Sequence, residues 1–412
     1  MSKRFFLLLL CMALPALASA GSVNIDASFR PDPAKPFENK FRNDTPNRAL
    51  CAAHPAYCAS LNIHSLFMPV TFSAKEPIRA GHSQRNGPMI KLPGWSDLQV
   101  THSQTGATDV LRVRIKGIGA TYYTFRSVED LTGIGGSWGH ARLWGSTWLT
   151  APPCTGVSYL SGVGHNWANF FWIFPNDETM CSKQANFDLD QGFVINYANT
   201  GNVIFAYELE TPNPLKMEAG LYTGQVTYTV GPGQQIDFGD VMLPSDSTFQ
   251  IVFTLTVEHT LKVEIPPGGN RIQLEPQGGW QAWLNQGRKP ARLFRDQTFN
   301  LSASSRFKMQ LECGTGQIGD TCAVKNAAGD LVPLDVLVSL PNGMTNTDGA
   351  AVNRLPLRVS GTGSELFQPS FYVDRRPATL HFEVQREGVE EMLKREGETW
   401  SGSVSVIWDS EV

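Results

Sequence analysis

The sequence predicts an all-β protein made of two β-sandwich domains in tandem. Glycine and proline are frequent, at 38 and 26 of 412 residues, and only 17% of the residues are charged. Short segments with alternating apolar and polar residues recur along the chain, and the one segment with a clear helical period is Arg386 to Arg395. Short alternating segments separated by turn residues are typical of half-buried strands. A chain of this length can bury two or three cores.

The start of the chain has the features of a secretory signal, which we place at residues 1–20. Lys3 and Arg4 precede the apolar stretch Phe5 to Leu14, and the small residues Ala18 to Ala20 form a cleavage site. We therefore expect export. No other apolar run approaches the length that a membrane span needs.

The charge balance disfavours nucleic acid as a partner. The chain has 34 basic and 38 acidic residues, a net charge of −4, and it becomes more negative when Lys3 and Arg4 leave with the signal. Nucleic acids and anionic membranes attract basic surfaces. Neither is expected as the main partner.

The cysteines predict disulfides. Cys11 leaves with the signal, and an even number remains, which in an exported chain points to disulfide bonds. Six cysteines allow fifteen connectivities, but these six fall into pairs that are close in sequence. The expected pairs are Cys51–Cys58, Cys154–Cys181 and Cys313–Cys322. No metal or cofactor is expected, since CxxC and HxxxH spacings are missing.

The first domain is predicted to span residues 21–257. Its expected strands are Leu61 to Phe72, Leu98 to Thr124, Phe187 to Ile195, Val203 to Glu210 and Phe249 to Val257. The alternating segment Val23 to Phe29 is either a first strand of this domain, which we favour, or an arm that pairs with another molecule. Residues 258–260 form a short linker, and the second domain covers residues 261–412.

A tryptophan-rich segment in the first domain is the main candidate for recognition. Residues 133–174 hold half of the ten tryptophans, among glycines and polar residues. Such rings can bind sugars or protein surfaces, or they can fill the core. The candidate receptor-binding residues are Arg48, Trp138, Arg142, Trp144 and Trp167.

Two glycine motifs are not expected to carry chemistry. Gly135 to Gly139 fits G-x-S-x-G, but a nucleophile elbow needs a strand before it and a helix after it, and the residues that follow do not predict a helix. His140 is expected to be solvated. Gly314 to Gly319 is expected to be a hairpin turn inside a disulfide loop. We find no catalytic residues, so the chain is not expected to be an enzyme.

A short repeat links the two domains. Tyr222 to Tyr228 matches Trp400 to Val406 as aromatic, hydroxyl, Gly, polar, Val, hydroxyl and apolar residues. Chance similarity between strands is the alternative. Further strands can follow the first copy, whereas nothing follows the second, so the second sandwich is expected to end one strand short. Its open edge should carry Val404, Val406 and Trp408 on one face.

Two stretches resemble a known family. Residues 278–313, from Gly278 to Cys313, are similar to a stretch of the CblD-like pilus-initiator family, which includes tip adhesins of colonisation-factor fimbriae and cable pili. Residues 220–233 with Asp237, Phe238 and Gly239 resemble the end of its adhesin domain.

This resemblance implies a two-domain minor pilus subunit at the fimbrial tip. An N-terminal domain would bind a host glycan or protein receptor, and a C-terminal pilin domain with an incomplete immunoglobulin-like fold would accept a strand. A periplasmic pilus chaperone would supply that strand first and hold the carboxylate of Val412. A major pilin subunit would replace it at the outer-membrane usher. Gly231 to Gly233 stands where some relatives have an arginine pair, so that receptor site is not transferred.

Two other functions compete with this one. A secreted two-domain carbohydrate-active hydrolase would use the tryptophan-rich face for its substrate. A periplasmic binding module would have a closed second domain, whose last strand is simply an edge.

Overall fold

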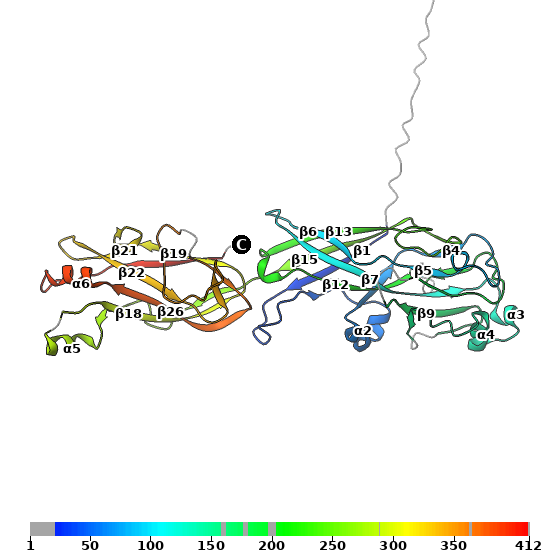
Figure 1. Ribbon diagram of the computed structural model, residues 1–412, viewed down its shortest axis with the longest axis horizontal. Coiled ribbons are helices and arrows are strands. Elements are labelled where there is room, and N and C mark those ends of the chain that lie inside the picture. The colour runs from blue at the N-terminus through cyan, green and yellow to red at the C-terminus, as the bar shows by residue number, and fades with distance from the viewer. Residues whose placement is uncertain are drawn as a thin grey trace, which may run out of the picture.

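The computed structural model describes residues 21–157, 162–175, 180–196, 203–287, 289–361 and 365–410. Strands and bridges make up 46% of the described residues, and the helices among them are short, which confirms the all-β class. Figure 1 shows the strands gathered into two bodies, one beyond the other along the longest axis. The expected signal, residues 1–20, and Val412 lie outside the described residues.

The first body is organised around one curled sheet of thirteen strands, with the order β14-β4-β11-β7-β6-β13-β15-β1-β2. Strands β9 and β12 also pair with β7, β8 pairs with β9, and β3 pairs with β12. Its strands, with the separate β5–β10 pair, are β1 (Gly21–Phe29), β2 (Arg42–Asn43), β3 (His64–Met68), β4 (Phe72–Ala74), β5 (Met89–Lys91), β6 (Ser96–His102), β7 (Thr108–Tyr123), β8 (Thr155–Gly156), β9 (Trp167–Ile173), β10 (Met180–Ser182), β11 (Val194–Asn196), β12 (Val203–Glu210), β13 (Gly220–Thr229), β14 (Met242–Pro244) and β15 (Thr248–Val257).

Strand β1 belongs to the first domain. It pairs in parallel with β15 over its whole length, from Gly21 opposite Phe249 to Phe29 opposite Val257. The side chains of Ile25, Ala27 and Phe29 are at most 3% exposed and form part of the core. Of the two alternatives for this segment, the structure shows the domain strand.

The first body also contains helices that the sequence did not predict. These are α1 (Leu50–Ala53), α2 (Pro55–Leu61), α3 (Val128–Thr132) and α4 (Gly136–Leu143). The expectation of no helix after Gly135 was wrong, because α4 begins there. The element before α4 is helix α3 rather than a strand, so Ser137 is not on a nucleophile elbow.

The second body is a sandwich of two sheets. One sheet has the order β16-β18-β26-β22-β21-β20, with β17 and β24 attached, and the other has the order β23-β25-β19-β27. Its elements are β16 (Leu261–Glu264), β17 (Glu275–Pro276), α5 (Gly279–Gln286), β18 (Leu293–Ala303), β19 (Phe307–Cys313), β20 (Gln317–Ile318), β21 (Thr321–Lys325), β22 (Leu331–Ser339), β23 (Met344–Asn346), β24 (Leu355–Pro356), β25 (Leu366–Pro369), β26 (Val373–Val384), α6 (Arg386–Leu393) and β27 (Val404–Ser410). The hairpin expected at residues 314–319 is present, but Gln317 and Ile318 form strand β20, and the turn to β21 is made by Gly319 and Asp320.

His259 joins the two bodies. Its Nε2 lies 2.9 Å from the carbonyl oxygen of Met217, and its Nδ1 lies 3.2 Å from the hydroxyl oxygen of Ser304. Its ring also meets that of Phe29 edge-on, with centroids 5.9 Å apart. The junction between β15 and β16 is therefore held by side-chain contacts to both domains.

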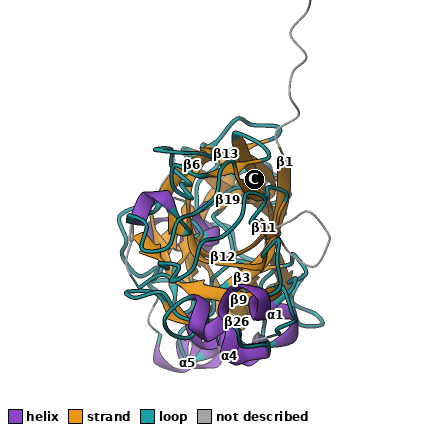
Figure 2. Cartoon of the chain, turned by 90° about the vertical axis from the view of Figure 1, so that its right-hand side faces the viewer, coloured by secondary structure: helices purple, strands orange, loops and turns teal. Residues whose placement is uncertain are grey.

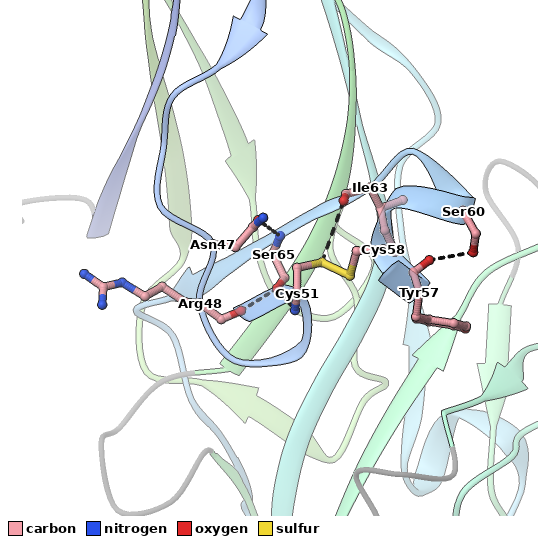
Figure 3. The surroundings of a disulfide bond; sticks show 8 residues. All are labelled: Asn47, Arg48, Cys51, Tyr57, Cys58, Ser60, Ile63 and Ser65. Carbon is pink, nitrogen blue, oxygen red and sulfur yellow. Dashed lines mark hydrogen bonds between the residues drawn. A yellow bond between two sulfur atoms is a disulfide. The ribbon is translucent and has the colours of Figure 1, made fainter. Parts of the chain in front are cut away.

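The three disulfides are the pairs expected from sequence spacing, Cys51–Cys58, Cys154–Cys181 and Cys313–Cys322. Figure 3 shows the first, which fastens α1 to α2. Cys51 is held further by its backbone N–H, which donates to Ser65 Oγ at 2.9 Å. Each bridge closes a local loop. Among the described residues, no helix is both long enough and apolar enough to span a bilayer.

Candidate strand-acceptor groove

Strand β27 lies at the edge of its sheet. It pairs antiparallel with β19 along all seven residues, from Val404 opposite Cys313 to Ser410 opposite Phe307, and no other described strand pairs with it. Its counterpart in the repeat, β13, lies between β6 and β15. In the first domain, β15 pairs with one side of β13. No described strand takes the corresponding place beside β27.

An apolar groove of about 940 Å³ runs along this open edge. One wall is β27, and the opposite wall is formed by β16 and the segment that follows it, with Val263, Ile265 and Leu274. The floor belongs to the core of the sandwich and is formed by Leu293, Phe299, Leu334, Leu380 and Phe382, which are 2–8% exposed. The side chains on the walls are more exposed than those of the floor.

The side chains of β27 divide between the two faces of the strand. Val404, Val406 and Trp408 are half-buried and line the groove, whereas the residues between them point away from it. Ile407 is 42% exposed on the outer face. This division follows from the strand period of two.

Such a groove is suited to a β-strand. An unpaired strand edge offers backbone N–H and C=O groups in a regular row, and the alternating side chains of an added strand can enter the apolar floor. Burying each apolar side chain contributes roughly 1.5–3 kcal/mol. Charged groups line the groove at one end, where Arg395, Glu396 and Glu398 follow α6.

Helix α5 contributes to the same groove, and the sequence did not predict it. Trp280 and Trp283 line the groove and meet edge-on, with ring centroids 5.6 Å apart. Their spacing of three residues was a possible helix signal, but the helix is only eight residues long, with Gly278 and Gly279 at its start and Gly287 at its end. Figure 1 shows α5 and α6 at the end of the second body that faces away from the first.

The candidate receptor-binding residues fall into separate places. Trp138 on α4 is 78% exposed, and Arg142 on the same helix is exposed and packs over the ring of Phe187 at 5.7 Å. Trp167 is half-buried at the start of β9. Figure 1 places α3 and α4 at the end of the first body farthest from the second, and Figure 2 looks onto this end.

Two of the candidates do not join this group. Arg48 lies beside α1, and Figure 3 shows its side chain pointing away from the disulfide. Trp144 is 6% exposed, so it is wrong as a receptor contact: its ring is part of the core. The indole N–H of Trp144 donates to Tyr122 Oη at 2.9 Å, which holds the ring inside.

His140 is buried, which corrects the expectation that it is solvated. Its Nε2 donates to the carbonyl oxygen of Gly164 at 2.9 Å, so its Nδ1 accepts from the hydroxyl of Tyr122 at 2.6 Å. Burial lowers the pKa of His140, because the charged form would lose its hydration. The histidine is therefore a neutral structural link between α4 and the segment before β9.

A second constellation has distances typical of serine hydrolases. Ser339 Oγ lies 2.8 Å from His381 Nε2, and His381 Nδ1 lies 2.7 Å from Asp296 Oδ1. However, Arg354 Nη1 is 3.1 Å from the same Nδ1, and the backbone N–H of Arg354 donates to Ser339 Oγ. The guanidinium competes with the carboxylate for the imidazole. None of these side chains lines the groove, and we regard them as a polar network between neighbouring strands, centred on the buried ring of His381.

Comparisons with known proteins return structural neighbours only. No protein-family model matches the sequence, and no characterised protein matches it. One solved structure with a similar chain is described as a chaperone–tip adhesin complex of CFA/I fimbriae biogenesis (8% identity, 95% of this chain and 97% of that one, TM-score 0.23). Another is a mutant of CfaE, the CFA/I adhesin of enterotoxigenic E. coli (9% identity, 95% and 93%, TM-score 0.24).

A third similar chain comes from a chaperone–tip subunit complex, CsuC–CsuE, of the archaic chaperone-usher Csu pili of Acinetobacter baumannii (10% identity, 95% and 98%, TM-score 0.21). All three are chaperone-usher tip subunits, the kind of protein to which the sequence resemblance points. At these identities and TM-scores the matches carry no weight for the function of this chain.

Proposed function

We propose that this protein is a fimbrial tip adhesin and an initiator of pilus assembly, which accepts a strand from another polypeptide into its C-terminal domain. The single observation that carries this proposal is the apolar groove beside β27, with Val404, Val406 and Trp408 on its wall. A periplasmic pilus chaperone would fill the groove first. A major pilin subunit would then replace the chaperone at the outer-membrane usher, with the chain exported to the cell surface.

The N-terminal strand supports a position at the end of the fibre. A shaft subunit needs a free arm to donate to its neighbour. Here β1 is bound to β15 across nine residue pairs, with three core side chains. Releasing β1 would expose Ile25 and Phe29 and would disrupt the first domain, so β1 is not available as a donor.

The first domain would bind the receptor, a host glycan or protein. The exposed face of α4 supports this role, since Trp138 presents a large apolar ring to solvent at the outer end of the domain. Tryptophan is enriched among the residues that contribute most to binding at protein interfaces. No catalytic role is part of the proposal.

A fusion tests the acceptor groove. A nine-residue segment with apolar residues at alternate positions is joined after Val412 through a flexible linker, and thermal unfolding of the full mature chain is measured. Filling the groove should raise the melting temperature of the C-terminal domain by about 10 °C or more, since several apolar side chains become buried. A scrambled segment serves as the control. Equal melting temperatures for the two fusions would contradict the proposal.

A further inference from the structure

A loop of the first domain contacts the second domain near the junction that His259 holds. This loop, residues 30–41, connects β1 to β2. The backbone N–H of Tyr372 donates to the carbonyl oxygen of Pro36 at 3.2 Å, and the ring centroids of Phe37 and Phe371 lie 4.8 Å apart. Figure 1 shows the loop at the end of the first body that faces the second. The two domains are therefore joined by this loop as well as by His259.

The loop alone is a weak link. Phe37 is 74% exposed, so its contact with Phe371 removes little apolar surface from water. The ion pair between Arg30 and Glu258 is also exposed, and exposed pairs contribute little to stability. Domains that share only a small interface move relative to one another by default. The relative position of the two domains therefore depends on His259.

The hydrogen bonds of His259 match its neutral form. Its Nε2 carries a proton, because the partner, the carbonyl oxygen of Met217, can only accept. Its Nδ1 then accepts from the hydroxyl of Ser304, whose oxygen accepts from the backbone N–H of Thr260 at 2.9 Å. Burial lowers the pKa of His259, although the hydrogen bond to Met217 acts in the opposite direction.

A proton on Nδ1 would disturb this arrangement. Nδ1 would become a donor, and the hydroxyl hydrogen of Ser304 would lose its acceptor. Ser304 is fully buried, and no other described group accepts from its hydroxyl. A buried hydroxyl without an acceptor and a buried charge without a counterion are both unfavourable. Both costs are relieved when the ring of His259 leaves Ser304 and Met217.

The charged groups near His259 do not supply that counterion. Those within two positions in sequence of the residues that contact it are Arg30, Lys216, Glu218, Glu258, Lys262 and Arg306. Each carboxylate of this set has its own partner: Glu258 pairs with Arg30, and Glu218 accepts from the hydroxyl of Thr105. Among the described residues, no carboxylate bonds to the imidazole of His259.

We infer that His259 is a pH-sensitive link between the two domains: the neutral ring fixes their relative position, and protonation of the ring releases it. The link does not depend on the strand-acceptor function. Because burial lowers the pKa of His259, the link is complete above about pH 6.5, the value for an unfolded chain. It is lost as the pH falls through the lower folded-state pKa. The mobility of the first domain relative to the second therefore rises in mild acid.

Amide hydrogen exchange of the full mature chain tests this link. The reporters are the backbone N–H of Thr260, which donates to Ser304, and that of Tyr372, which donates to Pro36 across the domains. After correction for intrinsic exchange, we expect both protection factors to fall about ten-fold or more between about pH 7.5 and about pH 5. In His259→Gln they should stay constant, because the amide can donate to Met217 and accept from Ser304 but does not titrate.

His140→Gln is the matched control, since His140 is another buried histidine of the first domain but lies on α4, at the end away from the junction. This variant should show the same fall as the native chain. Constant protection in the native chain, or an equal fall in His259→Gln, would overturn the inference. A fall at Thr260 without one at Tyr372 would overturn it too, because the two domains would then still be held together.

Discussion

Trp408 of β27 meets Phe299 of β18 edge-on, with ring centroids 5.1 Å apart, and so connects the two sheets of the C-terminal domain. The same indole lies 5.8 Å from the ring of Phe307 on β19. These contacts hold β27 over the core, although β19 is the only described strand that pairs with it.

Two neighbouring residues of β27 should respond differently to the same substitution. Val406→Asp places a carboxylate in the apolar groove and should abolish binding of an alternating apolar peptide, because the charge would have to lose its hydration. Ile407→Asp changes the outer face and should leave binding within about two-fold, a difference near the uncertainty expected for surface substitutions. Both variants are compared by peptide anisotropy. Equal effects would show that the groove is not the binding site.

Removal of the indole at position 408 should destabilise the C-terminal domain. Trp408→Ala deletes the contacts to Phe299 and Phe307, and we expect a loss of about 2–4 kcal/mol in the free energy of unfolding, measured by urea denaturation. Trp408→Phe keeps an aromatic ring and should lose less. A similar loss in both variants would argue against the ring packing described. Trp408→Asp should also abolish co-purification with a pilus chaperone, if the acceptor function is right.

Substitution of two tryptophans in the first domain should affect different properties, receptor binding in one case and the free energy of unfolding in the other. Trp138→Ala should change the free energy of unfolding by no more than about 0.5 kcal/mol, since the ring is exposed, and should weaken attachment to a receptor identified by glycan array. Trp144→Ala should cost about 3–5 kcal/mol because it opens a cavity in the core. Undiminished attachment of the Trp138 variant would remove this end of the domain from the receptor site.

The first domain should lose stability in mild acid through His140. Burial lowers the pKa of this histidine, so its contribution is complete above about pH 6.5, the value for an unfolded chain, and is lost as the pH falls through the folded-state pKa. Melting temperatures between pH 7.5 and pH 5 should therefore fall more steeply for the native chain than for His140→Gln. The glutamine amide can still donate to Gly164 and accept from Tyr122. If the melting temperatures of the native chain and of His140→Gln fall equally with pH, His140 is not the cause of the loss of stability in acid.

Ser339 should be unreactive toward an active-site serine probe. Arg354 Nη1 can only donate to His381 Nδ1, and the imidazole then carries its proton on Nε2 and cannot accept the proton of Ser339. A fluorophosphonate should not label the full chain, with mass spectrometry as the measurement. Labelling that disappears in Ser339→Ala would instead favour the hydrolase alternative.

The sequence by itself determined the features that depend on residues close to one another along the chain. The alternation in β7, β15 and β27 predicted strands and the face of each that is buried, because a strand's side chains alternate between its two faces. The spacing of Cys154 and Cys181, and of the two shorter pairs, was enough to predict the disulfides. The repeat at Trp400 also predicted that β27 lies at an edge.

Only the tertiary structure decided which aromatic rings are accessible and which segments are helical. Trp138 and Trp144 lie six residues apart in one segment, yet one is solvent-exposed and the other buried, because Tyr122 on a distant strand holds the second indole. Helices α4 and α5 are short and contain glycine, so their intrinsic preference for the helical conformation is weak. Contacts with remote residues stabilise them. For the same reason, the contribution of α5 to the groove could not be predicted, because α5 lines the groove together with α6 and β27, which are distant from it in sequence.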